Sequence, residues 1–551
     1  MIKKFTLTAF LFISLIVQAK NINWDFNIDI ETRGNSYITG IEFDKQFGIY
    51  GIVHFDDRLI FGTDTLTNKI GEEDIAIVKY NILGQYQWVR HFENNSNYLT
   101  GKGDLCIDNV NAIYFACNYS DSLGYNDVQF KASENGKGGI VAKFNNSGDA
   151  LWLKEISSAG IISDLQCEYA DEQLYLGCGF TESLQIDTVA IEGLPNYYSN
   201  AFVCATDTAL KVKWRHAYTL NTMFPMPTFN TVKVNNEGKL LLAGTVSVNV
   251  DFGNNVSITN AFDNVFVTQF NKNGIAQWAN VSLGYGQLNN MSVGNNNSIF
   301  LTGMFLNDIG FGIHSVTSPI ADHDAEIFLA KLNNEGEAQY VKGFGSVHTG
   351  YDAGLAYVDG LLDYGFLISE FGDTLTMGSD SVFAVKKPSN NSLSYNLAVS
   401  MHNGNGEPVW LTYLGLEGDG HFGDIKIAND KLFFAGHILG GLSAKSAMVV
   451  ENKNAVISAV DVESLETLRA YNVNAESLQV YPNPVKNTFT VVLPNFADNS
   501  EEILLITNIE GRLAKTIITQ SAVQDIDIQE LPSGIYFIKT RNSAPIKLVK
   551  Q

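Results

Sequence analysis

An aromatic residue returns along this chain at a nearly constant interval, each time in the same local context. In NVFVTQFNKNGIAQW, residues 264–278, it follows an apolar segment and an Asn-x-x-Gly turn. The repeated aromatic residues are Trp24, Trp88, Trp152, Trp214, Trp278, Tyr340 and Trp410, separated by 64, 64, 62, 64, 62 and 70 residues. A repeat of this kind is typical of folds that copy one supersecondary unit many times.

Each repeat carries a second marker after its aromatic residue. The marker is an apolar run that follows a polar turn, such as NAIYFACN at 111–118, KLLLAGTV at 239–246 and KLFFAGHI at 431–438. Apolar residues at consecutive positions indicate strands whose sheet is covered on both faces, and no helical period appears. We therefore predict four strands per repeat: the aromatic strand, the strand of the apolar run, a further strand, and the strand that leads into the next turn.

A ring of small sheets covers both faces of every sheet, because each sheet packs against its two neighbours. The repeat that starts at Trp24 lacks a preceding strand, and residues 446–460 supply a strand with no aromatic residue after it. Pairing of these two segments would close the ring and leave no open edge. We predict an all-β chain with a seven-bladed β-propeller of four-stranded blades at residues 20–460, in which the aromatic residues anchor neighbouring blades. A linear solenoid is the alternative.

The turn before each aromatic strand has a defined chemistry. Asparagine accepts a hydrogen bond at the start of the turn, and glycine takes the left-handed conformation that ends it. The third copy carries Asp207 and Leu210 at these two positions. Because a leucine is strained in the left-handed conformation, we expect this turn to differ in shape.

The repeat resembles the bacterial seven-bladed propeller repeat family. The typical unit of that family has an Asp-x-Phe-Val-x-Lys strand, an Asn/Asp-x-x-Gly turn and a Trp strand, and the resemblance covers roughly residues 23–460. It implies a propeller fold on exported or surface proteins, and the family has no agreed catalytic set.

The N-terminus has the features of a secretory signal peptide. Two lysines precede a nearly unbroken apolar run at residues 5–17, and small residues follow at cleavage spacing. The apolar run is short for a bilayer span, so we predict a signal peptide at residues 1–19 that is removed before Lys20. The formal net charge of -23 makes nucleic acid a poor partner, and acidic surfaces are also ordinary solubility devices.

The repeat ends at a polar linker, residues 461–477, and a different sequence pattern follows it. Residues 478–551 resemble the C-terminal sorting domain of the type IX secretion system, type A. The motif residues are Tyr481, Pro482, Asn483, Pro484, Gly511, Leu531, Gly534 and Tyr536, with a basic ending at Lys547 and Lys550. The resemblance implies a small antiparallel β-sandwich, contact with the type IX secretion machinery of the outer membrane, and delivery to the surface of a Bacteroidetes-type bacterium or into the medium.

The cysteines suit an oxidising compartment. Cys106 and Cys117 are eleven residues apart around a polar turn, and so are Cys167 and Cys178. If each segment is a hairpin, its two cysteines lie opposite one another, and a disulfide forms only at a non-hydrogen-bonded pair. The sequence leaves two readings open, two cross-strand disulfides or four buried thiols. Cys204 lies within a strand, and we predict a buried free thiol.

Signatures of chemistry are missing from the sequence. It contains no HExxH, Gly-x-Ser-x-Gly, P-loop or Rossmann motif. We interpret the cluster Asp322-His323-Asp324 with Glu326 as a solvated turn, and an isolated Gly418-Asp419-Gly420-His421 as weak evidence for a site. No catalytic residue, metal ligand or cofactor is therefore predicted.

These observations favour an exported cell-surface or secreted protein that binds an unknown extracellular ligand, a glycan or a protein, without catalysis. One alternative is an extracellular carbohydrate-active enzyme, a lyase or hydrolase, that uses carboxylates at the propeller channel. The other is a passive structural protein of the surface layer.

Overall fold

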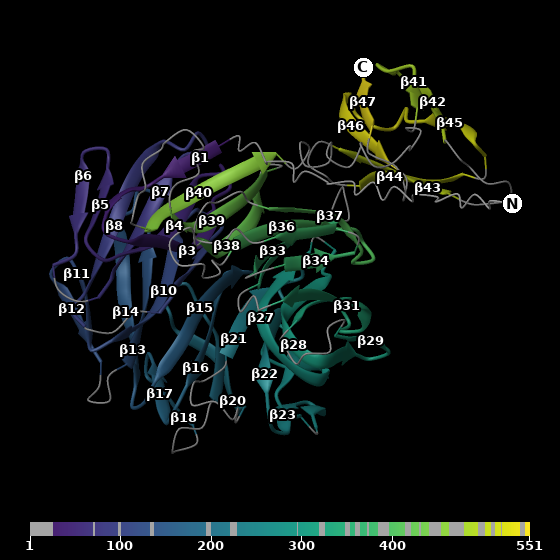
Figure 1. Ribbon diagram of the computed structural model, residues 1–551. Coiled ribbons are helices and arrows are strands. Elements are labelled where there is room, and N and C mark those ends of the chain that lie inside the picture. Colours follow the sequence, from purple (N-terminus) through teal and green to yellow (C-terminus); the bar gives the residue numbers. More distant parts are fainter. Residues whose placement is uncertain are drawn as a thin grey trace, which may run out of the picture.

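The computed structural model describes residues 26–69, 72–96, 101–132, 137–193, 200–220, 229–259, 261–294, 296–318, 326–347, 353–358, 364–371, 374–378, 380–383, 396–413, 420–428, 431–439, 453–461, 479–493, 502–508, 513–519, 521–539 and 546–551. The predicted signal peptide, Trp24, Gly511 and residues 462–477 of the predicted linker lie outside these residues. Within them the chain is built of β-strands and contains no helix (Figure 1). Accordingly, this part of the chain has no helix long and apolar enough to cross a membrane.

Residues 26–461 form seven antiparallel sets of four strands. The first four sets are β3 (Ser36–Phe43), β4 (Ile49–Phe55), β7 (Asp74–Tyr80), β8 (Tyr86–Asn94); β9 (Asp104–Ile107), β10 (Ile113–Ser120), β13 (Lys137–Phe144), β14 (Ala150–Ser158); β15 (Ile162–Ala170), β16 (Gln173–Phe180), β19 (Asn200–Thr206), β20 (Val212–Thr219); and β21 (Phe229–Val234), β22 (Leu240–Val246), β25 (Asn264–Phe270), β26 (Ala276–Val281). We call these the first to fourth sheets.

The fifth to seventh sheets have the same order. They are β27 (Leu283–Val293), β28 (Ile299–Phe311), β30 (Glu326–Leu332), β31 (Ala338–Val347); β32 (Ala353–Val358), β33 (Tyr364–Phe371), β36 (Asn396–His402), β37 (Pro408–Tyr413); and β38 (Gly420–Ala428), β39 (Lys431–Leu439), β40 (Lys453–Asp461), β1 (Phe26–Asp29). The repeat aromatic lies in the fourth strand of the first six sheets. Each of these six sheets therefore ends on the strand that follows the tight turn of its repeat.

The seventh sheet joins the two ends of this region. Its fourth strand is β1, which pairs antiparallel with β40 so that Phe26 faces Ala459 and Asp29 faces Val456. The predicted pairing between the N-terminal segment and the strand near residues 446–460 is therefore confirmed. The first strands of the sheets, here called the inner strands, contact one another in the cyclic order β3, β9, β15, β21, β27, β32, β38 and back to β3. Figure 1 shows the first sheet in purple beside the green strands β38, β39 and β40 of the seventh.

Apolar side chains fill the layers between consecutive sheets. β25, for example, is buried along its whole length, as predicted for a strand covered on both faces. One buried cluster joins the first and second sheets through residues such as Phe92 and Phe115. Another joins the seventh and first sheets through Ile457 and Val53. Burial between sheets is the main stabilising contribution, at about 25 cal/mol for each Å² of apolar surface.

The prediction of four strands per repeat was incomplete. Additional hairpins occupy the connections between the second and third strands: β5 (Arg58–Phe61) with β6 (Asp64–Thr67), β11 (Ser122–Tyr125) with β12 (Val128–Lys131), β17 (Ser183–Ile186) with β18 (Val189–Glu192), β23 (Val250–Gly253) with β24 (Val256–Ile258), and β34 (Thr374–Met377) with β35 (Asp380–Phe383). In the fifth sheet β29 (His314–Thr317) pairs with an extended β28, and β2 (Glu31–Arg33) pairs with β5.

Several hairpins pair with the fourth strand, here called the outer strand, of the preceding sheet and so cover its edge. β11 pairs with β8, β17 with β14, and β34 with β31. An uncovered outer strand presents unpaired N–H and C=O groups to other chains, so this arrangement protects the outer edges of three sheets.

The turn of the third sheet corrects the expectation about its shape. Leu210 adopts the left-handed conformation with φ 65°, and its N–H donates to the Asp207 carbonyl at 3.0 Å. In the fourth sheet Gly274 has φ 77° and donates to Asn271 at 2.9 Å, so the two turns share one geometry. The Leu210 side chain is fully buried among the second and third sheets, and this apolar burial offsets the backbone strain.

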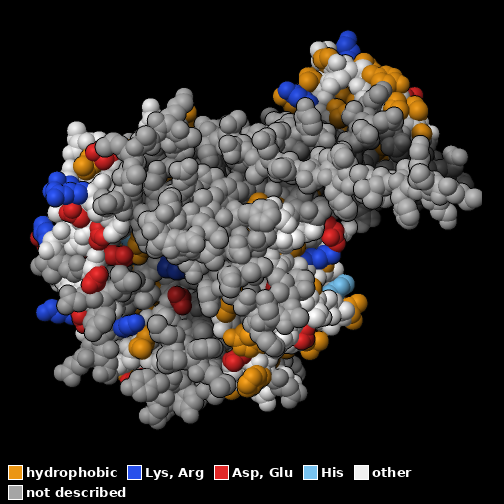
Figure 2. All heavy atoms as spheres, viewed as in Figure 1, with side chains coloured by type: hydrophobic (Ala, Val, Ile, Leu, Met, Phe, Trp, Pro, Cys, Tyr) orange, Lys and Arg blue, Asp and Glu red, His pale blue; other side chains and the backbone are white. Residues whose placement is uncertain are grey.

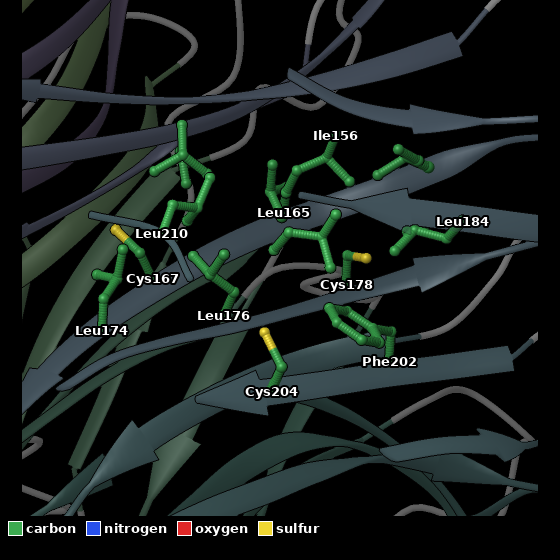
Figure 3. Close-up of a cluster of buried hydrophobic side chains, with 14 of the residues drawn as sticks. Ile156, Leu165, Cys167, Leu174, Leu176, Cys178, Leu184, Phe202, Cys204 and Leu210 are labelled. Carbon is green, nitrogen blue, oxygen red and sulfur yellow. The ribbon is translucent and has the colours of Figure 1, made fainter. Parts of the chain in front are cut away.

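The cysteines are all buried thiols in this structure. Of the two readings that the sequence left open, hairpin disulfides Cys106–Cys117 and Cys167–Cys178 or four buried thiols, this structure has the thiols. The hairpin registers give the reason, because Cys106 faces Tyr114 and Cys167 faces Leu176. Figure 3 shows Cys167, Cys178 and Cys204 in the apolar layer between the second and third sheets.

Residues 479–551 form two further antiparallel sheets. One has β41 (Gln479–Tyr481), β42 (Thr488–Val492) and β45 (Val523–Asp527); the other has β43 (Glu502–Asn508), β44 (Leu513–Thr519), β46 (Gly534–Lys539) and β47 (Ile546–Lys550). Side chains from both sheets, such as Phe489 and Leu504, share one buried cluster. This arrangement agrees with the small antiparallel module expected from the sequence.

Candidate functional sites

Several repeat aromatics contact the turn of the following sheet. The indole N–H groups of Trp88, Trp214 and Trp278 donate to the carbonyls of Asn146, Lys272 and Asn334 at 3.1, 2.9 and 3.0 Å. A Cβ added to the glycine of that turn would lie 2.8, 2.6 or 2.5 Å from the nearest indole atom. The glycine is thus required both by its positive φ and by the aromatic ring.

The other repeat aromatics differ in what the structure describes. Gly406 lies against the Tyr340 ring in the same way as the glycines against the indoles. Trp152, which faces the turn with Leu210, packs at the margin of the apolar cluster that contains this leucine. Trp24 and the Trp410 side chain lie outside the described residues.

Ion pairs join neighbouring inner strands. Lys426 of β38 pairs with Glu42 of β3, and Lys233 of β21 pairs with Glu168 of β15 at 2.5 Å. These four side chains are 22–29% exposed. Burial disfavours the charge on Lys233, but the negative charges of Glu168 and Asp104 outweigh it and raise the pKa of Lys233.

Polar side chains of two inner strands also bind the backbone of the next inner strand. Asp424 accepts a hydrogen bond from the Ile41 N–H at 3.0 Å, and Asp104 accepts one from the Cys167 N–H at 3.0 Å. Burial raises the pKa of Asp104 to about 6 and that of Asp424 above its usual range. Figure 2 shows acidic and basic side chains near the middle of one face of the molecule.

A second polar cluster lies where the first and seventh sheets meet. The Tyr37 hydroxyl donates to Glu73 at 2.5 Å, and its ring stacks on His54 with centroids 4.9 Å apart. His437 of β39 meets the Tyr37 ring at 6.0 Å, edge to face. We call Tyr37, His54, Glu73 and His437 the seam cluster.

The contacts of His54 define its protonation. This side chain is 1% exposed, and burial lowers its pKa to about 4, so the ring is neutral at pH 7. Its Nε2 lies 3.1 Å from the Lys102 carbonyl, which only accepts, so the proton is on Nε2. The unprotonated Nδ1 then lies 3.8 Å from a Glu73 oxygen. No sequence motif indicated the seam cluster, because its members come from three strands and from the residue before β7, and they follow no regular spacing.

The connections divide between the two ends of the strands. The start of β3, the end of β4 and the start of β7 adjoin, as the pairings of Ser36 with Phe55 and of Phe55 with Asp74 show. We call this the connection end, because the links between sheets and the extra hairpins leave from it. The opposite, turn end carries tight turns such as those at Asn145 and Asn271. The seam cluster lies at the connection end.

The described residues contain no group of three or more His, Cys, Asp or Glu side chains suited to a metal. Asp322, His323, Asp324, Gly418 and Asp419 lie outside them, as does the His421 side chain. Glu326 begins β30 as a buried residue whose carboxylate accepts from Ser318 at 3.1 Å.

In the C-terminal module, Asn483 joins the Tyr481–Pro484 motif to the last strand. Its amide donates to the Lys547 carbonyl at 2.6 Å and accepts from the Val549 N–H at 2.9 Å. Pro482 and Pro484 flank it and have no N–H to offer a ladder. The Asn483 side chain therefore makes hydrogen bonds to the backbone of β47 at a place where the two prolines cannot donate any.

Lys550 connects β47 to residues 528–531, where the second motif segment, residues 531–536, begins. Its ammonium group donates to the carbonyls of Ile528 at 2.6 Å, Gln529 at 3.1 Å and Leu531. The Tyr536 hydroxyl donates to the Pro532 carbonyl at 2.8 Å, which fixes the turn that includes Gly534. The described motif segments are thus joined through β47.

A family model described as a secretion system C-terminal sorting domain matches residues 479–551. A search of curated proteins finds no match to the chain. Among solved structures, a protein of unknown function from Dyadobacter fermentans DSM 18053 is 9% identical over 80% of this chain and 98% of its own, with a TM-score of 0.35.

Two further solved structures are similarly distant. Acylaminoacyl peptidase from Pyrococcus horikoshii is 11% identical over 84% of this chain and 59% of its own, with a TM-score of 0.38. PorZ, an essential bacterial surface component of the type-IX secretion system of Porphyromonas gingivalis, is 9% identical over 95% of this chain and 100% of its own, with a TM-score of 0.22. TM-scores this low carry no argument about fold or function.

The family match and the joined motifs agree at the C-terminus. Residues 479–551 are a secretion-system C-terminal sorting domain, and the protein that carries it is delivered by type IX secretion to the outer cell surface or the extracellular space.

Proposed function

We propose that this protein is an exported seven-bladed β-propeller that binds an extracellular glycan or protein without catalysis. The seven four-stranded sheets, the cyclic contacts of their inner strands and the β1–β40 pairing support the propeller. In this proposal the signal peptide at residues 1–19 is removed, residues 20–460 form the binding domain, and residues 461–477 link it to the sorting domain.

The observation that carries the binding proposal is the unequal distribution of connections. Among the strands that the structure describes in the seven sheets, the links between consecutive sheets and the extra hairpins leave from the connection end, whereas the described turns at the turn end, such as those at Asn145 and Asn271, are short and hydrogen-bonded. Loops on a rigid scaffold are the usual place for recognition, because they vary without disturbing the core. We therefore assign ligand binding to the connection end.

Binding is tested with the exported protein on glycan arrays and in pull-downs from surface extracts. We expect a ligand whose binding is lost when the connections at residues 194–199 and 221–228 are replaced by Gly-Ser segments of equal length. The control replaces turn-end residues 272–273, which should leave binding unchanged. A clean negative across broad panels would refute the proposal.

A catalytic alternative follows from Asp104. Its carboxyl pKa of about 6 suits a general acid, and it faces the same inner-strand region as Glu168 and Lys233. An enzyme of this kind would release reducing ends or unsaturated uronides from a polysaccharide. If so, Asp104→Asn abolishes that release while the folded state persists. Absence of turnover on a broad polysaccharide panel excludes this alternative.

A further inference from the structure

The second and third sheets bring two cysteines together that the sequence pattern did not pair. Cys106 of β9 and Cys167 of β15 belong to one buried apolar cluster, and their exposed fractions are 5% and 0%. β9 and β15 are consecutive inner strands in direct contact. The two residues thus lie across the interface between two sheets, not across one hairpin.

Three contacts fix the position of the Cys167 thiol. Its Sγ lies 3.7 Å from the Asp104 carbonyl and 3.7 Å from the Tyr114 carbonyl, and its backbone N–H donates to the Asp104 carboxylate at 3.0 Å. Tyr114 is the residue directly opposite Cys106 in the β9–β10 pairing. The Cys167 sulfur therefore lies beside Cys106 in the β9–β10 ladder.

The remaining cysteines provide an internal comparison. Cys178 faces Phe202 while Cys204 faces Leu176, so these two are diagonal neighbours on adjacent strands. Diagonal neighbours are about 7–8 Å apart, which exceeds the separation that a disulfide spans. Cys117 lies in a different cluster and contacts the carbonyls of Gly101 at 3.5 Å and Asn118 at 3.2 Å.

We propose that Cys106 and Cys167 form a disulfide between the second and third sheets in the exported protein. Type IX delivery carries the chain through the periplasm, where disulfides form and persist. The oxidant is a protein disulfide of a thiol oxidoreductase. One cysteine thiolate attacks it to give a mixed disulfide, the other cysteine displaces the oxidoreductase thiolate, and two electrons and two protons leave with the reduced dithiol.

This disulfide forms during folding, before the interface between the second and third sheets buries the two thiols. Burial raises the pKa of both thiols in the folded state, so the attacking thiolate becomes scarce and inaccessible after folding. Oxidised glutathione supplied during refolding should therefore crosslink the pair. The same reagent added to the folded, reduced protein should not.

Peptide mapping tests the pairing directly. Cleavage before aspartates gives each cysteine its own peptide: 104–107, 108–120, 164–170, 171–186 and 187–206. The protein is collected from the cell surface, quenched with acid, alkylated under denaturing conditions and digested. We expect three alkylated cysteines, and peptides 104–107 and 164–170 linked until reduction. Cys106→Ser and Cys167→Ser should each leave the other cysteine alkylated, and Cys117→Ser should leave the linkage intact.

Two results would overturn the proposal. One is alkylation of all five cysteines in the surface protein. The other is a link between peptides 104–107 and 108–120, which would restore the hairpin pairing. If the serine variants fail to fold, the wild-type map and the glutathione refolding experiment still decide between these outcomes.

Discussion

At the scale of single residues, the Asn-x-x-Gly turns combine two demands on one glycine. Gly274 has φ 77°, and a Cβ there would lie 2.6 Å from the Trp214 ring. Gly253 offers a matched control, because its φ is 83° but nothing lies within 4 Å of an added Cβ. A comparison of the two positions separates backbone strain from contact with the indole.

We therefore predict that Gly274→Ala is more destabilising than Gly253→Ala. The control should lower the free energy of unfolding by about 1 kcal/mol, from the left-handed conformation alone. Gly274→Ala should lower it by roughly 2–4 kcal/mol, because the indole must also move. Chemical denaturation followed by tryptophan fluorescence measures both. Equal losses would show that the indole contact contributes nothing.

His54 gives a prediction about pH. Its pKa is about 4 in the folded protein against 6.5 in an unfolded chain, so the unfolded state binds the proton first as pH falls. The stability due to neutral His54 is present above pH 6.5 and is lost towards pH 4, a change of about 3 kcal/mol. His54→Gln keeps a donor for the Lys102 carbonyl but does not titrate. Denaturation between pH 7 and 4 should show a smaller loss in the variant, and an identical loss would refute the assignment.

Residue roles were predictable from the sequence only where they repeat. The aromatic positions could be predicted from their spacing, because the same contact with the next turn recurs at Trp88, Trp214 and Trp278. Tyr37, His54 and Glu73 have no such copies, and they meet because three strands end together. The cysteine pairing depended on hairpin register, which a spacing of eleven does not define.

At the scale of elements, the extra hairpins act on sheet edges. β11–β12 covers the outer strand β8, whereas β23–β24 pairs with no other described strand. Both contribute buried aromatic residues, Phe130 and Phe252 among them. The two hairpins therefore differ chiefly in edge protection. Their strands are three or four residues long in polar connections, which explains why hydrophobic patterning did not reveal them.

Removal of β11–β12 should cause association between molecules. Ser120 faces Lys137, so a two-residue Asn-Gly turn can join them directly in place of the hairpin. Loss of the hairpin then exposes the edge of β8. The control joins Val246 to Asn264, which also face each other, and removes β23–β24. Light scattering over a concentration series should show assembly of the first variant beyond that of the control. Equal behaviour of the two variants would exclude an edge-protecting role.

At the scale of the whole molecule, two long-range pairings organise the chain. β1 pairs with β40 across more than 400 residues, and Asp424 and Lys426 bind the strand that contains Ile41 and Glu42. The sequence indicated the first pairing, because one repeat lacked a strand and another segment supplied one. It did not indicate the second, since ion pairs between inner strands follow no visible spacing.

Delivery of the whole molecule should depend on one buried lysine of the sorting domain. Lys550 is 7% exposed and donates to three backbone carbonyls, whereas Lys547 on the same strand is exposed. Lys550→Met leaves those carbonyls without their donor, so it should destabilise the domain by roughly 2–4 kcal/mol. Lys547→Met changes the net charge equally but removes no such contact.

Cell fractionation with an antibody against the N-terminal region distinguishes the two variants. The Lys550→Met protein should remain in the periplasm, as should a chain that lacks residues 478–551, because the machinery then meets an unfolded domain. The Lys547→Met protein should reach the surface at the wild-type level. If both lysine variants reach the surface at the wild-type level, secretion does not depend on the folded structure that Lys550 stabilises. If both are retained, positive charge on β47 is the recognised feature.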